Sequence, residues 1–260
     1  MAGSSSERSE DVATPTATVP AKRDVRERLD RVDDPELDQS IVELEYIDRI
    51  EIDDGDVTVE FTLPTAWCSP AFAWMMATDA RDEVDSLPGT DSVTIRLRDH
   101  MHEEEITRGV NEHESFEAMF PDADGGVQDV RAVLDEKARF ARQHEAVEAC
   151  LEAGLTPAQI VALERGDVEL TDGGAVVSVQ EIRVVAAAEP IAEYLDKASA
   201  SGNVTDPDDR LFLTIDADPI PPEEFELLHK RTRLAGVNMG GQGAVCDALN
   251  QSRREKLGRK

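Results

Sequence analysis

Cys68 is the residue whose type and position first suggest chemistry. Residues 56–62 alternate apolar and polar side chains, which predicts a half-buried strand, and Pro64 ends that strand because proline cannot donate to a sheet ladder. Ser69 and Pro70 predict the start of a helix, as N-cap and first-turn residue. A cysteine at this junction lies beside backbone amides and the positive end of a helix dipole. Both favour the thiolate, the form that attacks electrophiles and binds metals.

Two further cysteines, Cys150 and Cys246, lie far from Cys68 in the sequence. Cys150 falls on the apolar side of a long predicted helix, which favours a place in the core, and Cys68 itself could be a small buried apolar residue. Cys246 lies in a glycine-rich segment without periodicity, where it could complete a site with Cys68 across the fold or across a dimer interface. An all-cysteine cluster needs four thiolates. A cluster here would therefore need a dimer, histidine or carboxylate ligands, or the cysteines of a client protein.

A second candidate group combines histidine with carboxylates. Asp99, His100 and His102 precede the run Glu103–Glu105, and such donors could bind a hard or borderline metal ion, although a solvated acidic loop explains them equally well. His229, which lies beside Lys230, is most simply a cation at the end of a helix.

Asp34 and Glu36 flank a proline and leave two interpretations open. Their side chains could bond local backbone groups in a turn that follows a helix. They could equally form an acidic face beside Cys68.

Charge is the dominant feature of the composition. The chain has 56 acidic and 27 basic residues, a net charge of −29 that is spread along its length, and lysine is scarce. A phosphate backbone would be repelled, so non-specific nucleic-acid binding is excluded as a default. A dispersed acidic surface poor in lysine is typical of a protein kept soluble in concentrated salt, which predicts a halophilic cytoplasm.

The chain is expected to be cytoplasmic. No apolar run approaches the roughly 20 residues that span a bilayer, and the N-terminus has no apolar signal-peptide core. Three widely spaced cysteines do not make a secreted disulfide framework.

These candidates are expected to lie on an α+β protein in four parts. Residues 1–20 are predicted to be a disordered tail, 21–98 a small α-β-β-α-β domain, 99–125 an acidic connecting segment, and 126–260 a mainly helical region with a short hairpin. Within the last part the expected elements are helices at 127–153, 157–163, 190–198 and 222–234, a hairpin of strands 168–170 and 175–179, a short strand at 211–214, and a glycine-rich tail from Gly236.

The first domain resembles the iron–sulfur (metal–sulfur) cluster assembly domain family. The resemblance rests on the order and spacing of four motifs, residues 34–37, 41–44, 62–70 and 87–93. It implies an α-β-β-α-β domain that presents a loop cysteine, here Cys68, and helps to mature iron–sulfur or other metal centres in client proteins. Thr65 lies in the same motif. The family usually places proline directly after the cysteine, whereas Ser69 intervenes here.

Segments beyond this domain look like an extended subgroup of the family. Leu97 to His100, the acidic stretch after them and residues 245–249 carry this resemblance. Such extended proteins accompany soluble diiron monooxygenases and are thought to assist assembly of their metal centres.

Other classes of function fit the sequence less well. Residues 150–236 have a faint tyrosine-recombinase pattern, but the two tyrosines, Tyr46 and Tyr194, lie far from the C-terminus where that nucleophile is found, so a diverged DNA-associated protein is the weaker alternative. The chain has no phosphate-binding glycine loop, no Gly-x-Ser-x-Gly elbow and no His-Glu-x-x-His motif. We therefore expect no enzymatic activity. A metal-free scaffold that docks an oxygenase or another client subunit is the main alternative.

The sequence thus predicts a maturation factor that binds an iron–sulfur cluster or iron transiently. Its expected partners are a client metalloprotein or the cluster-assembly machinery, with no membrane, no nucleic acid and a homodimer as an option. The predicted handling residues are Cys68 and Cys246, and the supporting residues are Asp34, Glu36, Thr65, Asp99 and His100.

Overall fold

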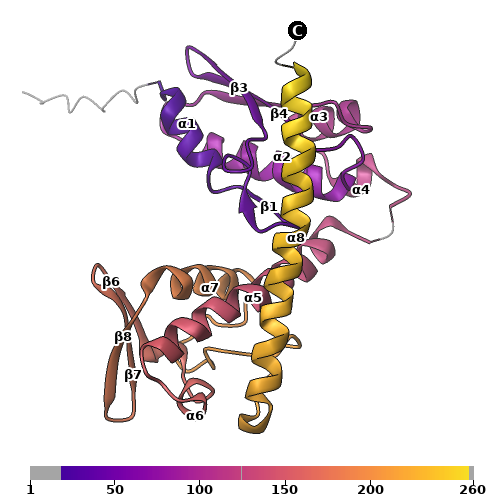
Figure 1. Cartoon of the computed structure of the whole chain (residues 1–260). Coiled ribbons are helices and arrows are strands. Elements are labelled where there is room, and N and C mark those ends of the chain that lie inside the picture. The colour runs from indigo at the N-terminus through magenta and orange to yellow at the C-terminus, as the bar shows by residue number, and fades with distance from the viewer. Residues whose placement is uncertain (1–18, 124, 258–260) are drawn as a thin grey trace, which may run out of the picture.

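The computed structural model describes residues 19–123 and 125–257. Positions 1–18 of the predicted disordered tail lie outside the described residues. Two groups of elements, each around its own apolar cluster, are joined along one side by a single long helix (Figure 1). None of the helices in the described residues has the length and apolar character needed to cross a membrane.

The first group has the predicted α-β-β-α-β order. Its elements are α1 (Lys22–Leu29), β3 (Ile47–Asp53), β4 (Asp56–Thr62), α2 (Pro70–Asp85) and β5 (Ser92–Arg98). Strand β4 is central, antiparallel to β3 and parallel to β5, so the chain must cross over through α2 between β4 and β5. The α+β fold class is confirmed.

Alternation in the sequence explains β4 and the helix that covers it. Val57, Val59 and Phe61 are buried against the buried face of α2, while the side chains between them are more exposed. The β3–β4 hairpin turns at Asp54 and Gly55, both with positive φ. Glycine is required at position 55, because a Cβ there would lie 2.6 Å from Asp91.

Short elements complete this first group. The two-residue strands β1 (Asp33–Asp34) and β2 (Gln39–Ser40) pair with each other. The stretch expected to be an acidic connection contains α3 (Glu103–Asn111) and α4 (Phe116–Met119), which place Ile106, Val110 and Phe116 in the first cluster. Charged residues surround these few apolar side chains, which is why the helical spacing was missed.

The second group surrounds α5 (Val127–Glu152). It comprises α6 (Pro157–Ile160), the 3₁₀ turn η1 (Arg165–Asp167), the antiparallel strands β6 (Val168–Thr171), β7 (Gly174–Val179) and β8 (Ile182–Ala186), and α7 (Ala188–Ala200). The predicted hairpin is confirmed, but β8, a third strand, was missed. The strand predicted at 211–214 is wrong: Leu211 to Leu213 are buried, yet among them only Leu213 pairs, in an isolated bridge with Pro219. Apolar character there reflects core packing, not sheet pairing.

The last helix differs most from prediction. After η2 (Pro222–Glu224), α8 runs from Phe225 to Leu257, whereas the sequence predicted an end at Leu234 and an irregular tail. It lies along α5 and continues past the first group (Figure 1). There the Asn250 side-chain amide donates to the Leu44 carbonyl at 2.8 Å, and Cys246 packs against the first cluster. Tertiary packing therefore overrides the low helix propensity of the glycines.

A charged cluster also joins the two groups. The nearly buried Asp38 carboxylate accepts from Arg142 Nε of α5 at 2.6 Å and pairs with Lys197 of α7 at 2.5 Å. Lys197 also bonds Asp33 at 2.7 Å. The β1–β2 turn is thus held to α5 and α7 by charge-assisted contacts.

Candidate functional site

The loop that carries Cys68 is ordered by its own backbone. The Thr65 carbonyl accepts from the Cys68 amide at 3.4 Å, and Thr65 Oγ1 accepts from the Trp67 amide at 3.2 Å. These bonds make a tight turn between β4 and α2. The Cys68 side chain is partly buried against the first cluster, whereas the Trp67 side chain is 75% exposed.

His100 holds this loop from the side. Its Nδ1 accepts from the His102 amide at 3.2 Å, so Nε2 carries the proton and donates to the Cys68 carbonyl at 3.0 Å. Next to it, the Met101 amide donates to the Ala66 carbonyl at 3.0 Å. Both ring nitrogens of His100 are thereby occupied. His100 therefore positions the Cys68 loop.

Asp99 starts the turn that brings His100 to the loop. It adopts a positive φ of 54°, and its amide donates to Glu103 Oε2 at 3.0 Å. The Glu103 carboxylate thereby fixes the turn that leads into α3. The hypothesis of a metal group at Asp99, His100 and His102 gains no support from these contacts.

Both interpretations of Asp34 and Glu36, a local turn and an acidic face beside Cys68, apply at once. Asp34 Oδ1 accepts from the Glu36 amide at 2.9 Å, which closes the local turn, and Asp34 Oδ2 accepts from the buried Tyr46 hydroxyl at 3.3 Å. Asp34 is only 6% exposed. Both carboxylates also act electrostatically on the Cys68 thiol, so they form an acidic face beside it.

Cys246 joins the same neighbourhood from α8. It packs against the apolar cluster that contains Cys68, and its charge when ionised raises the pKa of Cys68 and of Tyr46. Cys246 and Glu36 line one cavity of about 400 Å³, together with residues of the α8 stretch 237–245. Residues 178 positions apart in the sequence thus come together, because α8 extends over the first group. We call Cys68, Cys246, Asp34 and Glu36 the two-thiol site.

The electrostatics of this site correct one expectation from the sequence. Burial raises the pKa of the Cys68 thiol to about 12, and the nearby Asp34 and Glu36 carboxylates and Cys246 add to the rise. The Ser69 amide, which hydrogen-bonds to the sulfur, lowers the pKa only in part. The predicted stabilisation of a thiolate by the helix start is therefore wrong. Desolvation and negative charge outweigh the helix dipole.

A cation would reverse this balance. Metal binding replaces the thiol proton, and the carboxylates that raise the pKa then stabilise the positive ion. The high pKa makes the two-thiol site a poor nucleophile, and within the described residues no three of its donor atoms lie within 4.8 Å of one another. Its donors are two sulfurs and two carboxylates, whereas a complete all-cysteine cluster needs four thiolates.

Ser69 shifts the helix by one residue without removing the cysteine from the loop. It is the N-cap of α2, and Pro70 takes the first helical position. A proline directly after Cys68 would have no amide hydrogen. Ser69 supplies the amide hydrogen that bonds to the Cys68 sulfur.

Neither tyrosine is placed as a nucleophile. Tyr194 is fully buried and donates its hydroxyl to the Leu211 carbonyl at 2.5 Å, and Tyr46 is buried against Asp34. The recombinase interpretation therefore has no nucleophile in the described chain. Cys150 is also fully buried, as predicted for a core residue.

Comparisons with known proteins bear on the first group of elements. Residues 22–97 match the model of a family described as iron-sulfur cluster assembly protein. An uncharacterized protein of Methanocaldococcus jannaschii is 33% identical over 94 residues, which cover 36% of this chain and 97% of that protein. No solved structure matches the chain.

Proposed function

Because the chain belongs to the iron–sulfur cluster assembly protein family through its residues 22–97, we propose that it is an accessory factor for metal-centre maturation. It holds iron or an iron–sulfur fragment as cargo at the two-thiol site and passes it to a client protein. The clients are iron–sulfur proteins or diiron oxygenases. The protein itself catalyses no covalent conversion of a substrate.

The convergence of Cys68 and Cys246 is the observation that supports this proposal most strongly. The two thiols come from a loop of the family domain and from a helix outside it; Asp34 and Glu36 act on Cys68, and Cys246 lines a cavity with Glu36. Each thiol that binds iron releases one proton, and the carboxylates offset the charge of the ion.

Incomplete coordination suits a carrier. Two thiols leave iron positions that cysteines or carboxylates of the client, or of a second copy of this chain, can occupy. Ligand exchange onto the client then transfers the cargo. A site with four thiolates of its own would hold the cluster more tightly.

Anaerobic reconstitution with iron and sulfide tests the proposal. We expect wild type to take up iron, Cys68→Ala and Cys246→Ala to lose most of that uptake, and the loaded wild type to activate an apo client enzyme. Cys150→Ala is the matched control, because it removes a thiol that lies in the other apolar cluster. Equal iron uptake by all four proteins would refute the role of the two-thiol site.

A second candidate function is a metal-free docking scaffold. Its support is a pair of exposed apolar side chains at the Cys68 loop, Trp67 (75% exposed) and Met101 (52% exposed). The test is a pull-down of a diiron oxygenase subunit by protein without bound iron. If the chain is a scaffold, Trp67→Ala lowers the amount of subunit recovered and Cys68→Ala leaves it unchanged. Loss of recovery with Cys68→Ala would favour the carrier.

We further propose a halophilic cytoplasm as its location. Thiols that handle iron must stay reduced, as they do in the cytoplasm. The net charge of −29 is suited to a high concentration of salt, which screens self-repulsion.

A further inference from the structure

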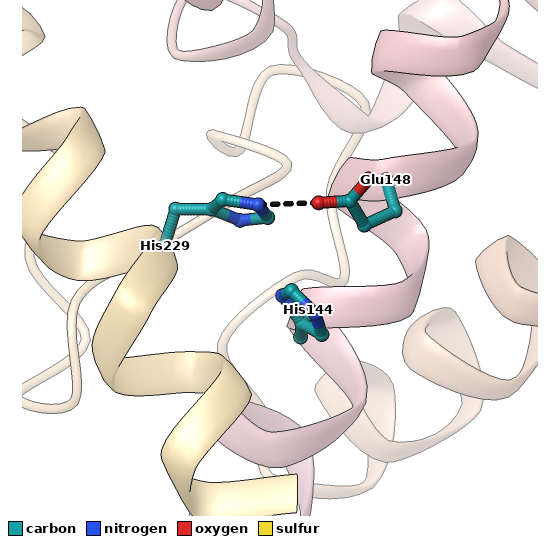
Figure 2. A group of neighbouring side chains, drawn as sticks. All are labelled: His144, Glu148 and His229. Atoms are coloured by element: carbon teal, nitrogen blue, oxygen red, sulfur yellow. Dashed lines mark hydrogen bonds and ion pairs between the residues drawn. The ribbon is translucent and has the colours of Figure 1, made fainter.

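A second group of metal-binding side chains lies between α5 and α8, apart from the two-thiol site. His144 and Glu148 are four residues apart on α5 and so share one face, and His229 of α8 points toward them (Figure 2). One possible ligand atom from each residue lies within 4.8 Å of the others. Within residues 19–123 and 125–257, this is the one group of three or more such residues that is close enough to share an ion.

The contacts within this group are those of a compact polar cluster. His229 Nε2 lies 2.6 Å from Glu148 Oε1, and the two imidazole centroids are 4.6 Å apart. Nδ1 of His144 and Nδ1 of His229 are both buried without a hydrogen-bond partner in the described chain. A buried polar atom without a partner costs about 1–3 kcal/mol, so two in one cluster require an explanation beyond a helix–helix hydrogen bond.

We propose that His144, Glu148 and His229 form a binding site for one divalent transition-metal ion. Two imidazoles and one carboxylate are the three protein ligands of catalytic zinc sites and of iron(II) sites, both of which keep a position open for water or another ligand. The carboxylate lowers the charge of the bound ion, and neutral imidazoles supply the remaining donors. Harder ions such as magnesium prefer oxygen ligands and are not expected to bind.

The geometry needs only a small adjustment to receive the ion. Ligand atoms about 2.1 Å from a tetrahedral ion lie about 3.4 Å apart. The contact between His229 Nε2 and Glu148 Oε1 must therefore open by less than about 1 Å, and the other ligand-atom distances, each at most 4.8 Å, must close by no more than about 1.4 Å, which side-chain rotations provide. A cavity of about 440 Å³, lined by His144, Glu145 and Arg233 among others, gives the ion access from solvent.

The position of the site suggests what the ion does. It ties the first part of α8 to α5, and Cys246 lies 17 residues beyond His229, about 25 Å along a helix that rises 1.5 Å per residue. A metal at His229 thus fixes the helix that carries the second thiol. It does so without contact to the two-thiol site.

Zinc titration of the full chain tests the site directly. The measurement uses chelator-treated Cys68→Ala/Cys246→Ala protein, so that the result does not depend on the proposed carrier function. We expect one zinc ion per chain by calorimetry, and cobalt(II) to give the visible absorption of low-coordinate histidine–carboxylate binding. Anaerobic iron(II) is the parallel arm that separates the two classes of ion, and magnesium is the control.

Three further variants in the same background decide the outcome. His229→Gln and Glu148→Gln are expected to weaken zinc binding at least tenfold and to abolish the rise in melting temperature that zinc produces. His113→Gln, which replaces an exposed histidine, should change neither. Circular dichroism identifies any variant that fails to fold. Absence of zinc and iron(II) binding by the parent, or equal affinity in His229→Gln, would overturn the proposal.

Discussion

At the scale of single residues, the charge state of Cys68 decides what the site can do. Its position before α2 was predictable from the alternation before Pro64 and the helix start at Ser69. The high pKa of its thiol was not predictable, because it results from burial and from the nearness of Asp34 and Glu36, and the local sequence pattern reveals neither. The general expectation that a helix start activates a cysteine fails here. The thiol is protonated at neutral pH until a cation displaces the proton.

Asp34→Asn tests this electrostatic account. Asparagine keeps an oxygen that can accept from the Glu36 amide but removes the charge that raises the pKa of Cys68. We expect alkylation of Cys68 by iodoacetamide at pH 8 to accelerate about tenfold, since loss of a nearby like charge lowers a pKa by about one unit or more. Peptide mass spectrometry separates Cys68 from Cys150, whose rate should not change.

The pH dependence of the wild type follows from the same shift. Because the folded-state pKa of Cys68 is about 12, against an ordinary value of 9.0, the folded protein keeps a proton that the unfolded chain loses between these values. The resulting stabilisation is fully present below pH 9 and is lost as the pH rises toward 12. Urea unfolding midpoints should therefore fall across this window, and by less in Cys68→Ala. Parallel curves for the two proteins would contradict the shift.

At the scale of elements, the sequence predicted what is local and regular. Strand β4 and helix α5 lie within a residue or two of their expected bounds, and α2 begins at the expected Pro70, because alternation and helical spacing are strong there. For α8 the sequence predicted too early an end, at Leu234, because four glycines between positions 236 and 243 favour irregular structure. Its continuation depends on packing against α5 and the first group. The predicted place of Cys246, in an irregular tail, was wrong for the same reason.

Gly240→Ala tests whether packing holds α8 together against its propensity. A Cβ at Gly240 meets no atom within 4 Å, so alanine adds helix propensity without a clash. We expect the unfolding free energy to rise by up to about 1 kcal/mol. Gly55→Ala is the opposite case, because its positive φ and its contact with Asp91 make alanine destabilising. Denaturant titration measures both, and a loss of stability in Gly240→Ala would contradict a continuous helix.

At the scale of the whole molecule, the two groups of elements are held by α8 and by the charged cluster at Asp38. This arrangement brings Cys246 to Cys68 and could not be predicted from sequence, since it joins residues more than 100 positions apart. Arg142 is central to the cluster, because it donates to both the side chain and the carbonyl of Asp38 at 2.6 and 2.8 Å.

Arg142→Met should therefore lower stability while it preserves much of the side-chain volume. Removing one partner of a nearly buried charge leaves Asp38 with Lys197 alone, and we expect a loss of about 2 kcal/mol. Arg23→Met removes a solvent-exposed pair with Asp24 and should lower stability far less than Arg142→Met does. Equal effects in the two variants would show that the Asp38 cluster does not hold the groups together.

The central claim is that Cys68 and Cys246 bind one cargo, and cysteine footprinting during reconstitution tests it most directly. Wild-type protein is alkylated with iodoacetamide before and after anaerobic loading with iron and sulfide, and each cysteine is quantified by peptide mass spectrometry. The proposed site predicts that Cys68 and Cys246 both become protected on loading, while the buried Cys150 is unaffected. Protection of Cys68 with no change at Cys246, or protection of neither, would contradict it.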